Sequence, residues 1–241
     1  MHLYDNLIQE SLNLVDETML RSLPLADSQN LWEAETEQRL IFQKDMAYEL
    51  GGSNLTAVSA LAFTSQPAET DQLLLYGPDL PQLQADSPYA RLTILHIDDR
   101  DWRDDRQAYQ LLRRMEYTRY HVYPQGFMMR ISTSAGREPV RVSRKALQKG
   151  LDFARVGQLF LDAYHRHPQI QAATLLFITA PDFPYDLLAQ KAARMETVTS
   201  SLDQIFNHLV MDCRSCNLKP VCDEVEGLRE LHFSRQQNTT S

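Results

Sequence analysis

Residues 153–164 read FARVGQLFLDAY, and residues 172–179 read AATLLFIT. In the first stretch, Phe153, Val156 and Phe160 recur every three or four positions, which predicts an amphipathic helix. The second stretch is a nearly unbroken apolar run of strand length, which predicts a buried strand. A clear helix followed directly by a clear strand indicates a fold that contains both.

The rest of the chain extends this pattern in both directions. Further strands are predicted at residues 40–42, 47–50, 58–63, 73–76, 92–97, 128–132 and 140–142. Further helices are predicted at residues 3–22, 98–120, from the N-cap Ser143 onward, and 184–206. Because the strands come in groups rather than in strict alternation with helices, we expect an α+β fold. It would hold a mixed β-sheet packed with helices, an N-terminal helix and a C-terminal cysteine-rich segment.

Changes in composition along the chain also predict four segments. Residues 1–37 are an N-terminal helix with an acidic linker, and residues 38–206 form the α+β domain. Residues 207–234 carry the cysteines, and residues 235–241 are expected to be a disordered tail.

The overall charge excludes one large class of partner. The chain of 241 residues has 24 basic and 32 acidic side chains, a net charge of −8. Nucleic-acid binding needs a basic face that neutralises phosphates, so none is expected. No secretory signal and no apolar run of membrane-spanning length is visible, so we expect no membrane span and a cytoplasmic location.

One segment departs from the acidic average. Residues 113–155 hold ten basic side chains against three acidic ones. A local basic segment in an acidic protein favours a small anionic ligand over a polymer. The alternative is a solvated basic hairpin in which Glu138 pairs locally.

All three cysteines lie close together, at Cys213, Cys216 and Cys222. An odd number in a tight group indicates reduced thiols rather than a disulfide framework. The spacing suits metal binding, because three thiolates can face one zinc ion or three irons of a cluster. His208 or His232 could complete a zinc site, and the remaining alternative is three unligated thiols.

Several short motifs, taken in order, give the chain a resemblance to a known family. They are residues 45–52 (DMAYELGG), 76–81 (YGPDLP) and 140–150 (VRVSRKALQKG), followed by the helix and strand of residues 160–178 and the cysteines. The order is similar to that in the middle domain of acetyl-CoA synthase, the beta subunit of the carbon monoxide dehydrogenase complex. The resemblance covers about residues 42–222.

This resemblance implies cofactors, a ligand and a partner. It implies a [4Fe-4S] cluster held by Cys213, Cys216 and Cys222, and a partner protein that supplies further redox or metal chemistry. It also implies that coenzyme A, or another anionic small molecule, is bound by an arginine-rich stretch. The matching arginines here are Arg130, Arg137, Arg141 and Arg144.

The departures from the family pattern limit the activity that we expect. The sequence holds three cysteines rather than the family's four for the cluster, and it has no Cys-Gly-Cys for nickel. The chain is therefore expected to be incomplete as an acetyl-CoA synthase. Two hypotheses follow: a stand-alone iron–sulfur module that binds an anionic ligand, or a non-catalytic assembly or regulatory protein with a structural zinc or a redox-sensing cluster.

Overall fold

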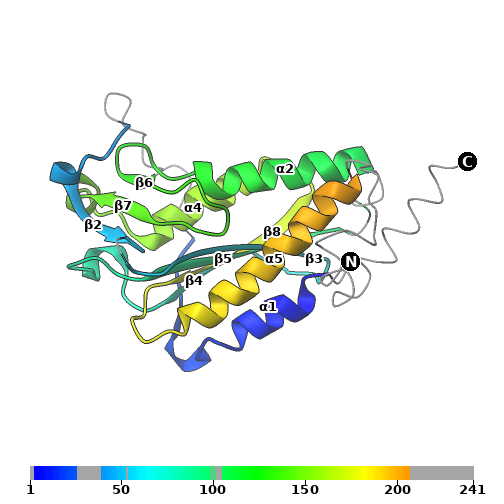
Figure 1. Cartoon of the computed structure of the whole chain (residues 1–241), viewed down its shortest axis with the longest axis horizontal. Coiled ribbons are helices and arrows are strands. Elements are labelled where there is room, and N and C mark those ends of the chain that lie inside the picture. The colour runs from blue at the N-terminus through cyan, green and yellow to red at the C-terminus, as the bar shows by residue number, and fades with distance from the viewer. Residues whose placement is uncertain (1–2, 26–38, 53, 99, 101–104, 207–241) are drawn as a thin grey trace, which may run out of the picture.

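The computed structural model of the chain describes residues 3–25, 39–52, 54–98, 100 and 105–206. Within this part, a five-stranded and a three-stranded sheet pack with helices, which confirms the predicted α+β class. Figure 1 shows the larger sheet edge-on between two layers of helices. On one side lie α2 (Asp105–His121) and α4 (Phe153–Tyr164), and on the other α1 (Asp5–Leu12) and α5 (Tyr185–Phe206).

The larger sheet is mixed, and its strand order is β1-β4-β8-β5-β3. The strands are β1 (Leu20–Ser22), β4 (Gln72–Tyr76), β8 (Ile170–Ile178), β5 (Tyr89–Ile97) and β3 (Ala57–Thr64). The pairs β4–β8 and β3–β5 are parallel, and the pairs β1–β4 and β5–β8 are antiparallel. Because helices cover both faces, every residue of β3 is buried, and six of its eight residues are apolar, the exceptions being Ser59 and Thr64.

The smaller sheet is antiparallel and lies at one end of the larger one (Figure 1). Its order is β2 (Met46–Leu50), β7 (Val140–Ser143) and β6 (Met128–Arg130). Ser87, just before β5, joins the two sheets, since its carbonyl accepts from Gly51 N–H (2.6 Å) and its N–H donates to the Glu49 carbonyl (3.1 Å).

Most of the predicted elements are confirmed. The helix predicted at residues 153–164 is α4, without a shift at either end. Ser143 begins the short helix α3 (Arg144–Gln148), where its side chain accepts a hydrogen bond from Ala146 N–H (3.1 Å). No helix in the described part of the chain is long and apolar enough to cross a membrane.

Two predictions are wrong, both near the N-terminus. The helix predicted at residues 3–22 ends at Leu12, because Asp16 caps a new 3-10 turn by accepting from Thr18 N–H (2.9 Å). Leu20–Ser22 then pairs with β4 as an edge strand. The strand predicted at residues 40–42 does not form, since only Ile41 is buried there and no described strand pairs with it.

The Gly-Pro-Asp turn of residues 77–79 has a structural role. Gly77 has φ +112°, and a Cβ on it would lie 2.3 Å from the backbone nitrogen of Ala180. The Asp79 carboxylate accepts from the N–H groups of Leu80 (2.6 Å) and Phe153 (2.9 Å). The turn therefore ties the ends of β4 and β8 to the start of α4.

Candidate ligand groove

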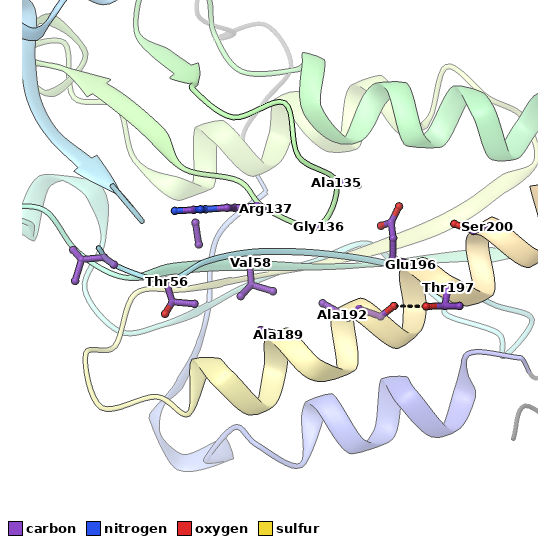
Figure 2. A pocket seen from close by; sticks show the side chains of 13 residues that line it. Thr56, Val58, Ala135, Gly136, Arg137, Ala189, Ala192, Glu196, Thr197 and Ser200 are labelled. Carbon is purple, nitrogen blue, oxygen red and sulfur yellow. Dashed lines mark hydrogen bonds between the residues drawn. The ribbon is translucent and has the colours of Figure 1, made fainter. Parts of the chain in front are cut away.

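A groove of about 610 Å³ lies between the start of β3, the loop that joins β6 to β7, and α5 (Figure 2). Its walls come from three parts of the chain that are far apart in sequence. The lining residues are Leu55, Thr56, Ala57, Val58, Ala135, Gly136, Arg137, Ala189, Ala192, Ala193, Glu196, Thr197 and Ser200.

The wall contributed by α5 is made of small side chains and one carboxylate, that of Glu196. The small residues Ala189, Ala192, Ala193, Thr197 and Ser200 recur at helical spacing and so follow one face of the helix; all but Ala193 are labelled in Figure 2. The Thr197 hydroxyl donates to the Ala193 carbonyl (2.8 Å), so its proton is already used and its oxygen can only accept a further hydrogen bond. This wall suits a narrow ligand that can lie close to the helix.

The loop wall is fixed at Gly136. This residue has φ +68°, its carbonyl accepts from Ser59 N–H in β3 (2.8 Å), and its N–H donates to the Tyr120 hydroxyl (2.9 Å). Arg130 stacks on the Tyr120 ring with its guanidinium carbon 3.6 Å from the ring centroid. Its Nη2 also donates to the Arg137 carbonyl (3.0 Å). The backbone beside Arg137 is thus held from both sides.

A buried ion pair holds the same loop from beneath. Glu138 and Arg91 are both 0 % exposed and lie 2.8 Å apart. The Tyr123 hydroxyl donates to the same Glu138 oxygen (2.9 Å), and the Arg91 guanidinium lies 3.8 Å from the Phe160 ring centroid. Burial raises the pKa of Glu138, although Arg91 opposes this effect.

A second buried arginine connects the loop side to α5. The Arg119 side chain is 1 % exposed, and its Nη1 donates to Glu196 (2.8 Å) and to Glu116 (3.1 Å). It also donates to the hydroxyl of Ser59 (3.1 Å) and to the Ser59 carbonyl. Burial raises the pKa of Glu116, and nearby Glu196 adds to this while Arg119 opposes it.

The four predicted arginines do not come together in one site. Arg130 lies opposite Val140 on the hairpin, and Arg141 is the next residue along, so their side chains leave opposite faces. Arg141 donates to Glu49 (2.7 Å), and Arg144 donates to the Lys44 carbonyl (2.9 Å).

Arg137 is the predicted arginine that lines the groove. Its side chain is exposed, and within the described part of the chain it has no hydrogen-bonding or ionic partner. An unpaired guanidinium offers five N–H donors to an oxyanion. Among the residues that the structure describes, the groove therefore holds the unpaired guanidinium of Arg137 and the carboxylate of Glu196, which is paired with Arg119 (2.8 Å).

The metal site predicted from the cysteines lies outside the described residues, since Cys213, Cys216 and Cys222 all follow residue 206. Among the residues that are described, no group of three or more His, Cys, Asp or Glu side chains is arranged to hold a metal ion. The donor set is known from the sequence alone. Three thiolates fit three corners of a cubane cluster, or three positions of a tetrahedral zinc ion.

Sequence reasoning missed the rest of the groove. Glu196, Ala57 and the α5 small-residue face were not identified, although the spacing of Ala189, Ala192 and Ser200 at helical intervals was a readable signal. The buried partner of Glu138 could not be read from the sequence, because Arg91 is 47 residues away.

Comparison with known families gives one match. The model of the family described as CO dehydrogenase/acetyl-CoA synthase complex beta subunit matches residues 32–182. The match includes the loop that carries Arg137 and ends before α5, which forms the opposite wall of the groove. No curated protein matches the chain.

Proposed function

The chain belongs to the CO dehydrogenase/acetyl-CoA synthase complex beta subunit family, and on that basis we propose that it is a ligand-binding iron–sulfur module of this family. In this proposal, coenzyme A or a similar anionic small molecule binds in the groove with its anionic group on Arg137. Cys213, Cys216 and Cys222 hold a [4Fe-4S] cluster, and a partner protein supplies the remaining redox or metal chemistry.

The observation that carries the ligand proposal is the position of Arg137. It is exposed, lines the groove and has no partner in the described part of the chain, whereas its loop is tied down at Gly136 and Glu138. A fixed backbone reduces the conformational entropy that ligand binding would otherwise cost. The guanidinium geometry matches phosphate oxygens, which coenzyme A carries in three groups.

The cluster proposal is supported by spacing and by family membership. Two cysteines three positions apart can direct both sulfurs at one metal centre, and the third follows six positions later. A cluster bound by three cysteines has one iron that is open to another ligand. When bound, such a cluster supplies one-electron transfer and a coordination position.

Calorimetric titration with coenzyme A tests the ligand site. Arg137→Ala should weaken binding by about 10-fold or more, because charge-assisted hydrogen bonds contribute roughly 1.5–3 kcal/mol. Arg144→Ala is the matched control, since Arg144 donates to the Lys44 carbonyl and does not line the groove. Equal affinities for the wild type and the Arg137→Ala variant would show that the groove is not the site.

Metal analysis of anaerobically purified protein tests the cluster. About four irons and four sulfides per chain, lost in Cys216→Ser, would support the proposal. About one zinc per chain without iron would instead support a non-catalytic assembly or regulatory protein with a structural clip.

A further inference from the structure

The groove exposes one edge of the larger sheet. β3 is the last strand of the order β1-β4-β8-β5-β3, so among the strands that the structure describes it pairs only with β5. The backbone groups of a strand point alternately to its two sides. Tyr89 N–H donates to the Thr56 carbonyl (3.0 Å), whereas Ser59 N–H donates away from β5 to Gly136 (2.8 Å).

Ala57 therefore points its backbone groups away from β5. It lies two residues before Ser59, and like Ser59 it directs both its N–H and its carbonyl toward the free edge. Ala57 also lines the groove, between Thr56 and Val58, which are labelled in Figure 2. Neither of its backbone groups has a partner within the described part of the chain. Edge groups of this kind are ready partners for an incoming amide.

The free edge inside the groove is short. At Ser59 the N–H is already bonded to Gly136, and the carbonyl accepts from Arg119. An added protein strand would need several unpaired N–H and carbonyl groups along this edge. Here the groups of Ser59, two residues after Ala57, are already hydrogen-bonded within the chain. This favours a ligand that offers a single amide over an extended peptide.

We infer that Ala57 binds one secondary amide of a linear anionic ligand, accepting its N–H and donating to its carbonyl, while Arg137 binds the anionic end. The inference rests on the proposed function, because it describes the same groove. The Gly136 carbonyl accepts from Ser59 N–H, so the backbone of Arg137 lies beside Ser59. Ala57 precedes Ser59 by two residues, which is about 7 Å along the strand. The small residues of α5 leave room for a narrow chain that spans these points.

Amide hydrogen exchange on the full chain, read residue by residue by NMR, tests this inference. The probes are 4′-phosphopantetheine, which has a phosphate and two amides, and 3′,5′-ADP, which has phosphates and no amide. We expect 4′-phosphopantetheine to slow exchange at Ala57 N–H by at least about 3-fold, the value of one modest hydrogen bond. At the same concentration, 3′,5′-ADP should leave Ala57 unchanged. Ser59 N–H is the internal control, since Gly136 already protects it.

A variant gives a second readout. Ala57→Pro removes the outward N–H without removing a ladder bond, and proline is tolerated at sheet edges. It should weaken 4′-phosphopantetheine binding by about 3- to 10-fold and leave the unfolding midpoint nearly unchanged. If the variant is unfolded, the exchange measurement on the wild type decides alone.

The two proposals fail in different ways. If 4′-phosphopantetheine leaves Ala57 exchange unchanged while Arg137→Ala still weakens its binding, the amide inference is wrong and the groove remains the anion site. If Arg137→Ala has no effect on either coenzyme A or 4′-phosphopantetheine binding, the proposed function itself is wrong, and the amide inference fails with it.

Discussion

Arg137 and Glu138 are consecutive residues of one loop, yet the fold uses their charges in opposite ways. Glu138 is completely buried and paired with Arg91, and the pair is joined by the Tyr123 hydroxyl. Arg137 is exposed on the groove and has no partner in the described part of the chain. An unpaired charge in the core would destabilise the fold, whereas an exposed charge is solvated by water and remains available to bind a ligand. Glu138 therefore stabilises the loop, and Arg137 is the residue that the loop exposes to the groove.

The largest expected effect comes from breaking the buried pair. Glu138→Ala should lower the free energy of unfolding by about 3–5 kcal/mol, because it leaves Arg91 charged and unpaired in the core. Urea unfolding measures this effect. The comparison variant is Glu49→Ala: the Glu49 side chain is 11 % exposed, but Arg141, which would lose its partner, is 29 % exposed and keeps contact with water, so the loss should cost less than at Glu138.

A double variant sharpens this prediction. Replacing the pair as Arg91→Met with Glu138→Met should recover most of the lost stability, since apolar residues of similar volume often replace a buried ion pair without cost. If Glu138→Ala costs no more than Glu49→Ala, the loop is not held by its buried charge, and the contrast with Arg137 disappears.

A smaller effect is expected at the glycine that fixes the loop. Gly136→Ala should cost about 1–2 kcal/mol, because φ is +68° while a Cβ there would meet nothing within 4 Å. Gly77→Ala should cost more, since its Cβ would also press on the Ala180 nitrogen. Thermal unfolding of the two variants ranks them. The reverse order would show that the loop, not the turn of residues 77–79, is the tighter constraint.

The local part of this architecture could be predicted from the sequence. The period of residues 153–164 and the apolar run near residue 175 predicted α4 and β8, because both patterns reflect burial within one element. Ser143 was recognisable as an N-cap for the same reason, since a cap is a contact over three residues.

The site was harder to predict because it is built from distant contacts. Four arginines in sequence suggested one anion site, but strand alternation sends Arg130 and Arg141 to opposite faces. Partners that occupy Arg141 and Arg144 come from about 92 and 100 residues away. The sequence showed the charges, but only the pairing across the fold shows that Arg137 is the one that lines the groove.

A pH experiment probes the buried side of the comparison with a smaller expected effect. Burial raises the pKa of Glu116 above its ordinary value of 4.5, and Arg119 offsets part of this rise. In the folded state Glu116 therefore keeps its proton at higher pH than in the unfolded state. Its contribution to stability is present below pH 4.5 and is lost as the pH rises through the raised pKa.

Urea unfolding of the wild type and Glu116→Gln at several pH values measures this contribution. Glutamine does not titrate, so the difference in stability between the two proteins should shift in favour of Glu116→Gln as the pH rises above 4.5. A difference that stays constant with pH would mean that Arg119 compensates the burial of Glu116 fully.

The smallest effect on stability is expected at Arg137 itself. Its side chain is exposed and has no partner in the described residues, so Arg137→Ala should change the free energy of unfolding by no more than about 0.5 kcal/mol. The bond from Arg130 survives, because it is made to the Arg137 backbone carbonyl. Urea unfolding beside coenzyme A titration gives both numbers for one protein sample. If Arg137 is an unpaired charge available to the ligand, Arg137→Ala should weaken coenzyme A binding and leave the free energy of unfolding almost unchanged. A stability loss above about 1 kcal/mol would mean that Arg137 has a structural partner, and Arg137 and Glu138 would then both stabilise the fold.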